Sequence, residues 1–179
     1  MEMTKIRTPR LLLRRVGSGD WQAIRGIWED AQRQEYAQYD RYNDTSPEAV
    51  RARIEKWASS RGSMEHMFFA VCLDGKVIGY MALNSRGGAV YELGYCFHSA
   101  YHGRGYAKES LLALIEKLRG GKLASRLTAG TALKNLPSVG LLRSVGFRLA
   151  GTEQVTFYKD ETGADIYFEG GIFELTIDG

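Results

Sequence analysis

A strand-like apolar run leads through a glycine-containing loop into a helix near the middle of the chain. The run covers residues 89–97 and the loop covers residues 98–105; the next segment repeats leucine and isoleucine at helical spacing until Gly120-Gly121. Because a helix start carries backbone N–H groups without helical acceptors, this order gathers hydrogen-bond donors at one point. The feature restricts the chain to folds that combine helices with a sheet.

The flanking segments extend the pattern. Amphipathic helices are expected from Trp21, with Asp20 as its cap, and from Pro47, with Ser46 as its cap. A β-hairpin is predicted over residues 68–83, with its turn at Asp74-Gly75. The remaining segments expected to be regular are a first strand at 10–16, a strand at 126–131, a helix at 136–145 and closing strands at 147–152, 155–158 and 172–177. The chain is therefore predicted to be one α/β domain with a mixed sheet.

Composition excludes several classes of protein. The 179 residues include 24 Lys+Arg and 21 Asp+Glu, and this net charge of +3 argues against a nucleic-acid-binding protein. Cys72 and Cys96 lie in apolar segments without C-x-x-C spacing, so neither a disulfide framework nor a zinc site is expected. His66 and His98 have no partners in the sequence that would make a metal site. The absence of an apolar leader or a membrane-spanning run predicts a cytoplasmic protein without membrane contact.

The glycine loop has the properties of an anion site. Gly103 and Gly105 allow a ligand to approach the backbone, while the helix dipole and Arg104 add positive charge. Lys108 stands where a dinucleotide fingerprint needs its third glycine, and no Walker A pattern occurs in the sequence. We therefore expect a phosphate or pyrophosphate here, although the glycines alone also fit a turn without a ligand.

Two spaced motifs carry a family resemblance. The segment His102-Gly103-Arg104-Gly105-Tyr106-Ala107 resembles the Q/R-x-x-G-x-G/A motif of the GNAT acyl-CoA N-acetyltransferase superfamily, with histidine replacing the usual first residue. Asn135, Ser138 and Gly146-Phe147 are similar to a second family segment, N-x-x-[SA] followed by G-F. The opening Thr8-Pro9-Arg10-Leu11 and the run Glu92-Leu93-Gly94-Tyr95 resemble the RimJ/RimL-like branch.

The resemblance implies a single GNAT-like domain over residues 1–179, with a mixed, mostly antiparallel sheet flanked by about four helices. It also implies a splay between the strands at about 90–97 and 126–131, into which the pantetheine arm of acetyl-CoA would insert. The residues implied to contact this co-substrate are Tyr95, Cys96, Phe97, His102, Gly103, Arg104, Gly105, Tyr106, Ala107, Lys108, Asn135 and Ser138. No metal is implied.

Acetylation of an amine needs a base, an oxyanion donor and a stabilised leaving thiolate. Glu92 is the candidate base, since it is the only carboxylate in its strand; a surface carboxylate paired with an arginine is the alternative. The tyrosine that many family members carry in the second motif is replaced by Leu142. The resemblance places Ser138 near the sulfur, although a serine at a helix start can also act only as a cap.

The resemblance places the acceptor pocket at the aromatic, acidic stretch from Tyr36 to Asp44, between the first two helices. Tyr36 and Tyr39 would form its walls, and Asp40 and Asp44 would hold an ammonium group. A surface loop with its tyrosines folded onto the core fits the same residues.

The resemblance thus implies direct acetyl transfer from acetyl-CoA to a primary amine, either a protein N-terminus or a small molecule. The alternative is a non-catalytic acyl-CoA-binding module on the same fold, and the missing third glycine and phosphate-loop lysine disfavour a general nucleotide-binding domain. The sequence leaves the oligomeric state open, although strands near the C-terminus could pair across a homodimer.

Overall fold

A computed structural model describes residues 3–177 and contains one eight-stranded sheet, with the strands in the order β1-β2-β3-β4-β5-β6-β8-β7. Only β5 and β6 run parallel; the other neighbouring strands are antiparallel. The strands are β1 (Lys5–Arg7), β2 (Leu11–Arg15), β3 (His66–Leu73), β4 (Lys76–Gly87), β5 (Val90–Phe97), β6 (Arg126–Ala132), β7 (Arg148–Lys159) and β8 (Asp165–Thr176). The predicted mixed, mostly antiparallel sheet is confirmed.

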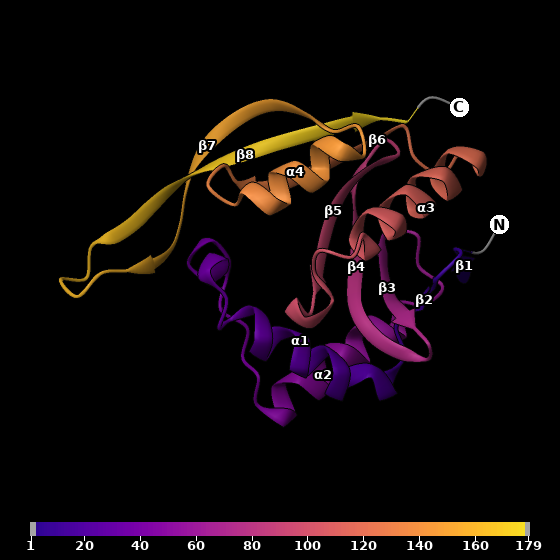
Figure 1. Cartoon of the computed structure of the whole chain (residues 1–179), viewed down its shortest axis with the longest axis horizontal. Helices are drawn as coiled ribbons and strands as arrows, with labels where there is room; N and C mark the ends of the chain where they lie inside the picture. The colour runs from indigo at the N-terminus through magenta and orange to yellow at the C-terminus, as the bar shows by residue number, and fades with distance from the viewer. Residues whose placement is uncertain (1–2, 178–179) are drawn as a thin grey trace.

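Four α-helices lie on the two faces of this sheet (Figure 1). They are α1 (Trp21–Ala31), α2 (Pro47–Ser59), α3 (Tyr106–Gly120) and α4 (Leu136–Ser144), and the short 3₁₀ segments are η1 (Ser18–Asp20), η2 (Glu35–Tyr39) and η3 (Ser99–Tyr101). None of the helices within residues 3–177 has the length and apolar composition needed to cross a membrane.

Two apolar clusters hold the helices to the sheet. On one face, Trp28 of α1 and Trp57 of α2 pack edge to face with centroids 5.8 Å apart, above the small strand residue Ala70. On the other face, Leu111 and Leu114 of α3 and Leu142 of α4 are fully buried against the sheet. Since apolar burial is the main stabilising contribution to folding, these clusters fix which face of the sheet each helix covers.

Several predicted elements are confirmed, including the hairpin turn. Asp74 and Gly75 both have positive φ, +48° and +82°, as a two-residue hairpin turn requires. The caps differ from the prediction. Asp20 accepts hydrogen bonds from the Gly17 amide and from Arg14 instead of capping α1. Ser46 makes no side-chain capping bond; its amide donates to Asp44.

The closing strands are longer than the sequence predicts. The segments expected at 147–152 and 155–158 form the single strand β7, and β8 begins at Asp165 rather than at residue 172. The two strands extend from the body of the molecule as an arm (Figure 1). Much of this arm is exposed. Its sequence therefore lacks the regular alternation of apolar and polar residues from which the full length of the two strands could be predicted.

Candidate functional site

Strands β5 and β6 separate after a short region of pairing. Their register covers Val90 with Arg126, Tyr91 with Leu127 and Glu92 with Thr128, and no pair follows within the described residues. We call the space between residues 93–97 of β5 and residues 129–132 of β6 the wedge. This is the splay expected between the two segments, and it leaves an opening in the middle of the sheet.

Two glycines keep one side of the wedge open. Gly94 of β5 and Gly130 of β6 are both exposed, although they lie in central strands. A Cβ atom on Gly94 would contact only the Ala82 side chain at 3.9 Å, and a Cβ on Gly130 would meet nothing within 4 Å. The pairing of Gly94 with Ala82 is regular, so the glycine produces open space rather than a bulge.

The glycine loop reaches α3 at the carboxyl end of β5. Gly103 and Gly105 have φ values of +72° and +80°, which L-residues with side chains rarely adopt. The helical hydrogen bonding begins with the Glu109 amide donating to the Gly105 carbonyl at 2.9 Å. The amides of residues 106–108 therefore have no helical acceptor, and this helix start is suited to bind an anion.

His102 stabilises the loop by a side-chain hydrogen bond to the end of β5. Its Nε2 atom lies 2.8 Å from the Phe97 carbonyl oxygen, so the imidazole closes the loop onto the end of β5. Arg104 and Lys108 remain exposed beside the loop. In this arrangement the two cations face solvent, without a bond to the loop among the described residues, whereas the imidazole of His102, although exposed, is bonded to the backbone of β5.

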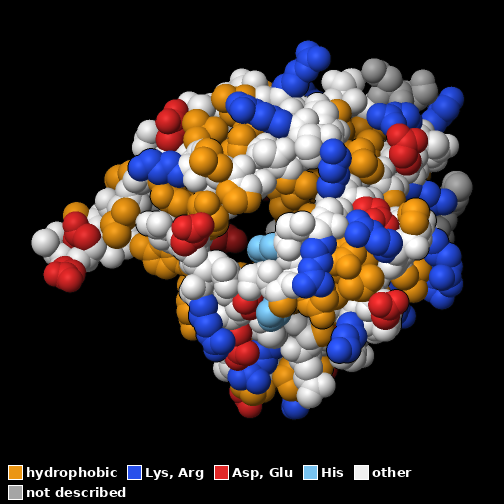
Figure 2. Space-filling view, in the orientation of Figure 1, with side chains coloured by type: hydrophobic (Ala, Val, Ile, Leu, Met, Phe, Trp, Pro, Cys, Tyr) orange, Lys and Arg blue, Asp and Glu red, His pale blue; other side chains and the backbone are white. Residues whose placement is uncertain are grey.

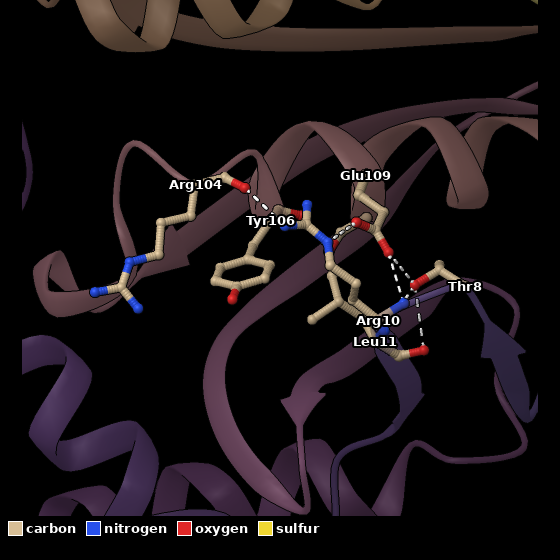
Figure 3. A network of polar contacts seen from close by, with 7 residues as sticks. Thr8, Arg10, Leu11, Arg104, Tyr106 and Glu109 are labelled. Carbon is tan, nitrogen blue, oxygen red and sulfur yellow. Dashed lines mark hydrogen bonds and ion pairs between the residues drawn. The ribbon is translucent and has the colours of Figure 1, made fainter.

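A second set of contacts ties the loop to the turn between β1 and β2; we call Thr8, Arg10 and Glu109 the loop clamp (Figure 3). Arg10 Nε donates to Glu109 at 2.7 Å, and its Nη1 donates to the Arg104 carbonyl at 3.0 Å. Its guanidinium also lies 4.5 Å from the ring centroid of Tyr106. Thr8 Oγ1 donates to the same carboxylate at 2.6 Å. Partial burial disfavours ionisation, but these hydrogen bonds outweigh it and hold the pKa of Glu109 below its ordinary value.

Helix α1 supports the loop from the opposite side. The Asp30 carboxylate accepts hydrogen bonds from the amide and the hydroxyl of Ser99 in η3, both at 2.7 Å. Burial opposes ionisation of Asp30, but the bonds from Ser99 prevail and lower its pKa. The loop is thus held between two carboxylates on different helices.

Glu92, Gly94 and Cys96 alternate with the buried residues of β5, so they lie on the face of the strand that α1 contacts. Figure 2 shows a hollow at the centre of the molecule, with acidic and histidine side chains at its edge. We call this space the α1-side cavity. Glu92 is ion-paired with Arg86 of β4, and its side chain is 40% exposed.

Asp40 is placed at the α1-side cavity by a contact with β7. The Tyr158 hydroxyl donates to the Asp40 carbonyl oxygen at 2.7 Å. Asp40 is exposed, but protein atoms around its carboxylate reduce hydration and raise its pKa. Burial, together with the charges of Asp40 and Asp30, raises the pKa of Cys96 to about 12.

The other residues predicted for the acceptor pocket make contacts elsewhere and do not gather around the Asp40 carboxylate. Tyr39 packs edge to face on Phe168 of β8, with centroids 5.3 Å apart, and Tyr36 is half-buried in η2. The Asp44 carboxylate accepts a hydrogen bond from the Ser46 amide at 2.8 Å, so it shapes the start of α2. The sequence analysis missed Tyr158, because no local pattern links it to a segment 118 residues earlier.

Helix α4 begins beside the other face of the wedge. Asn135 caps it by accepting a hydrogen bond from the Ser138 amide at 3.2 Å. The Ser138 hydroxyl lies 2.7 Å from the Tyr95 hydroxyl on β5. Leu142, one helical turn further on, is fully buried in the core. Among the described residues, no group of three His, Cys, Asp or Glu side chains could hold a metal ion.

Comparisons with known proteins identify related sequences and folds. A family model described as an acetyltransferase (GNAT) domain matches residues 10–148. The uncharacterized N-acetyltransferase YnaD of Bacillus subtilis is 26% identical over 91% of this chain and 94% of its own. The L-amino acid N-acetyltransferase AaaT of Escherichia coli is 22% identical, over 88% and 95%.

A solved structure of RimL, a ribosomal L7/L12 α-N-protein acetyltransferase in complex with coenzyme A, has a similar fold. Its TM-score is 0.81, its sequence is 16% identical, and the match covers 97% of this chain and 98% of that chain.

Proposed function

Because this chain belongs to the GNAT acetyltransferase family, we propose that its wedge and glycine loop bind acetyl-CoA and that its α1-side cavity binds the accepting primary amine. One observation carries the proposal: the wedge opens at the end of β5, where the loop presents unpaired amides at the start of α3. A ligand with a diphosphate and an extended arm fits both parts together. The whole of residues 1–179 would act as one such domain.

The diphosphate site is assigned to the loop. The amides of residues 103–108 would donate to phosphate oxygens, and the exposed cations Arg104 and Lys108 would add electrostatic attraction. His102 would act by shaping the loop, since its ring is bonded to the Phe97 carbonyl. The backbone of Tyr95, Cys96 and Phe97, which has no β6 partner, would pair with the amides of the pantetheine arm.

Acetyl-CoA supplies an activated thioester, and the residues around the wedge supply the other requirements. Glu92 is proposed to take the proton of the ammonium group, directly or through water, from its position where the strands separate. An amide of residues 95–97 would donate to the developing oxyanion. Ser138 would donate to the leaving sulfur, and Asn135 holds the start of its helix in place.

The acceptor is proposed to enter through the α1-side cavity as a cation. The Asp40 carboxylate would favour an ammonium group there. Tyr36 and Tyr39 precede it in the same segment, and the packing of Tyr39 on Phe168 would hold that segment in place. Both kinds of acceptor expected from the sequence, a protein N-terminus and a small-molecule amine, have an ammonium group.

Calorimetric titration with acetyl-CoA, beside ATP and NAD, tests the binding site. We expect saturable binding of acetyl-CoA and a large loss of affinity in Gly105→Val, because residue 105 has positive φ and a Cβ there would lie 3.4 Å from Arg10. Gly62→Ala is the matched control, since its Cβ would meet nothing within 4 Å. Unchanged heats at millimolar acetyl-CoA would refute the proposal.

Release of free thiol in the presence of amines and peptides tests the activity. Glu92→Gln should retain binding and lose transfer. Acetyl-CoA binding without thiol release for any acceptor of a broad panel would instead support the acyl-CoA-binding alternative, for which Leu142 at the tyrosine position of the family is the favouring observation.

A further inference from the structure

A hydrogen bond connects the two sides of the wedge. Tyr95 of β5 and Ser138 of α4 are 43 residues apart, and their hydroxyl oxygens lie 2.7 Å from each other. Tyr95 lies three residues beyond Glu92, where the pairing with β6 ends, and α4 directly follows β6 in the chain. The contact therefore lies where the strands have separated, on the face covered by α3 and α4.

The environment determines which hydroxyl is the better donor. The ring of Tyr95 packs against the apolar cluster beneath α3 and α4. This burial raises the pKa of Tyr95 despite the opposing effect of its bond to Ser138, so the phenol keeps its proton at neutral pH. A phenol has one hydrogen to donate and is a stronger acid than a serine hydroxyl.

Ser138 retains a free hydrogen in this arrangement. Its amide donates to Asn135, which fixes the residue in the first turn of α4. If its Oγ accepts from Tyr95, its own hydroxyl hydrogen points to a third group. The Ser138 side chain is half-buried, so a ligand in the wedge can reach it.

We propose that Tyr95 is a positioning residue that donates to Ser138 Oγ and thereby directs the Ser138 hydroxyl hydrogen toward the sulfur that leaves during acetyl transfer. The proposal rests on the proposed function. In the transfer, the amine nitrogen forms a bond to the carbonyl carbon, the C–S bond breaks, and its electron pair stays on sulfur. The hydrogen bond from Ser138 stabilises this thiolate, and the ammonium proton leaves through the base on the other face.

Tyr95 acts by orientation and keeps its own proton. A thiol is more acidic than a phenol, with pKa values of about 8.5 and about 10, so a net transfer from tyrosine to the thiolate is unfavourable. The arrangement supplies a donor at the wedge although Leu142 carries no hydroxyl. Here a tyrosine of the strand would support a serine of the helix.

The affinity for coenzyme A as a function of pH tests this inference without knowledge of the acceptor. Calorimetry between pH 7 and 10 would compare coenzyme A, whose thiol ionises in this range, with acetyl-CoA, which has no free thiol. A donor aimed at the sulfur favours the thiolate, so the affinity for coenzyme A relative to acetyl-CoA should rise roughly tenfold with pH.

Variants separate the roles of the two hydroxyls. Tyr95→Phe and Ser138→Ala should each lose most of the rise with pH, when the affinity of each variant for coenzyme A is divided by its own affinity for acetyl-CoA. The double variant should lose no more than Ser138→Ala alone, because Tyr95 acts through Ser138. Tyr91→Phe is the matched control: it lies on the same face of β5, where β5 and β6 are still paired, and should retain the full rise.

Three results would overturn the inference: an unchanged rise in Tyr95→Phe, a larger loss in the double variant than in Ser138→Ala, or no rise in the unsubstituted protein. Each result is expressed relative to the variant's own affinity for acetyl-CoA, and saturable binding of acetyl-CoA also reports that the variant is folded. If the unsubstituted protein bound no acetyl-CoA, the proposed function itself would fail and this inference with it.

Discussion

Arg10 and Glu109 lie 99 residues apart in the sequence, and their side chains meet at 2.7 Å beneath the glycine loop. The same guanidinium donates to the Arg104 carbonyl and covers the ring of Tyr106 (Figure 3). One residue of the turn between β1 and β2 therefore holds both the loop and the first turn of α3. The geometry of the anion site depends on a contact outside the motif that defines it.

Replacing Arg10 by alanine should weaken both stability and coenzyme binding. The side chain is 45% exposed, so the loss of its ion pair and hydrogen bonds should cost about 1 kcal/mol of unfolding free energy. A loop without this support should bind acetyl-CoA roughly fivefold more weakly. Urea unfolding and calorimetry would measure the two effects, with Arg7→Ala as a control that removes an exposed arginine of β1. Equal acetyl-CoA affinities for the two variants would contradict a role in the loop.

Asp20 should make the free energy of unfolding depend on pH in the acidic range. Burial opposes its ionisation, but hydrogen bonds from Arg14 and the Gly17 amide hold its pKa below the ordinary value. Because the folded pKa is lower than the unfolded one, this stabilisation is present above about pH 4 and is lost as the pH falls through the folded value.

Asp20→Asn should therefore cost about 2 kcal/mol of unfolding free energy at pH 7 and much less near pH 2. Thermal or urea unfolding across this range would measure the difference between the two proteins. A difference that stayed constant down to pH 2 would show that the carboxylate charge is not the cause.

The sequence predicts the parts of the fold that have local patterns. Helices with buried stripes, the Asp74-Gly75 turn and the strand–loop–helix unit are all found close to their expected positions. β1 has only three residues and was missed, since so short a strand shows no periodicity. The length of β7 and β8 depends on pairing within an exposed arm, which the pattern of apolar residues does not record.

The candidate site likewise has one part that a local sequence pattern predicts and other parts that no local pattern predicts. The loop at 102–108 is continuous in sequence, so its glycines and helix start could be identified together. The contacts of Ser138 with Tyr95 and of Tyr158 with Asp40 join residues that are 43 and 118 positions apart. Only the folded arrangement of strands, helices and loops brings such residues together, and local patterns in a single sequence do not predict contacts of this kind.

Asp40 should favour binding of a cationic acceptor at the expense of stability. Reduced hydration raises its pKa in the folded protein, so folding favours the protonated carboxyl and the ionised form is a cost at neutral pH. Asp40→Asn should raise the unfolding midpoint slightly at pH 7 and should have less effect near pH 4, where the native residue becomes protonated.

The same variant should raise the KM for an amine acceptor roughly tenfold, because it removes the negative charge that faces the ammonium group. Steady-state kinetics at pH 7 would measure this, with Asp44→Asn as a control whose carboxylate is bound to the start of α2. An equal rise in KM for the two variants would show that Asp40 has no special role in binding.

Cys96 should remain unreactive although it lies on the same face of β5 as the proposed base Glu92. Burial and the charges of Asp40 and Asp30 raise its pKa to about 12, so almost no thiolate is present at pH 7. A thiol in this state cannot take the acetyl group efficiently, and direct transfer to the amine needs no such intermediate.

Cys96→Ala should therefore keep most of the acetyl transfer activity, and intact mass spectrometry of the unsubstituted protein with acetyl-CoA should show no acetylated enzyme. A stable acetyl adduct that disappears in Cys96→Ala, together with loss of activity, would replace direct transfer by a two-step mechanism through this cysteine.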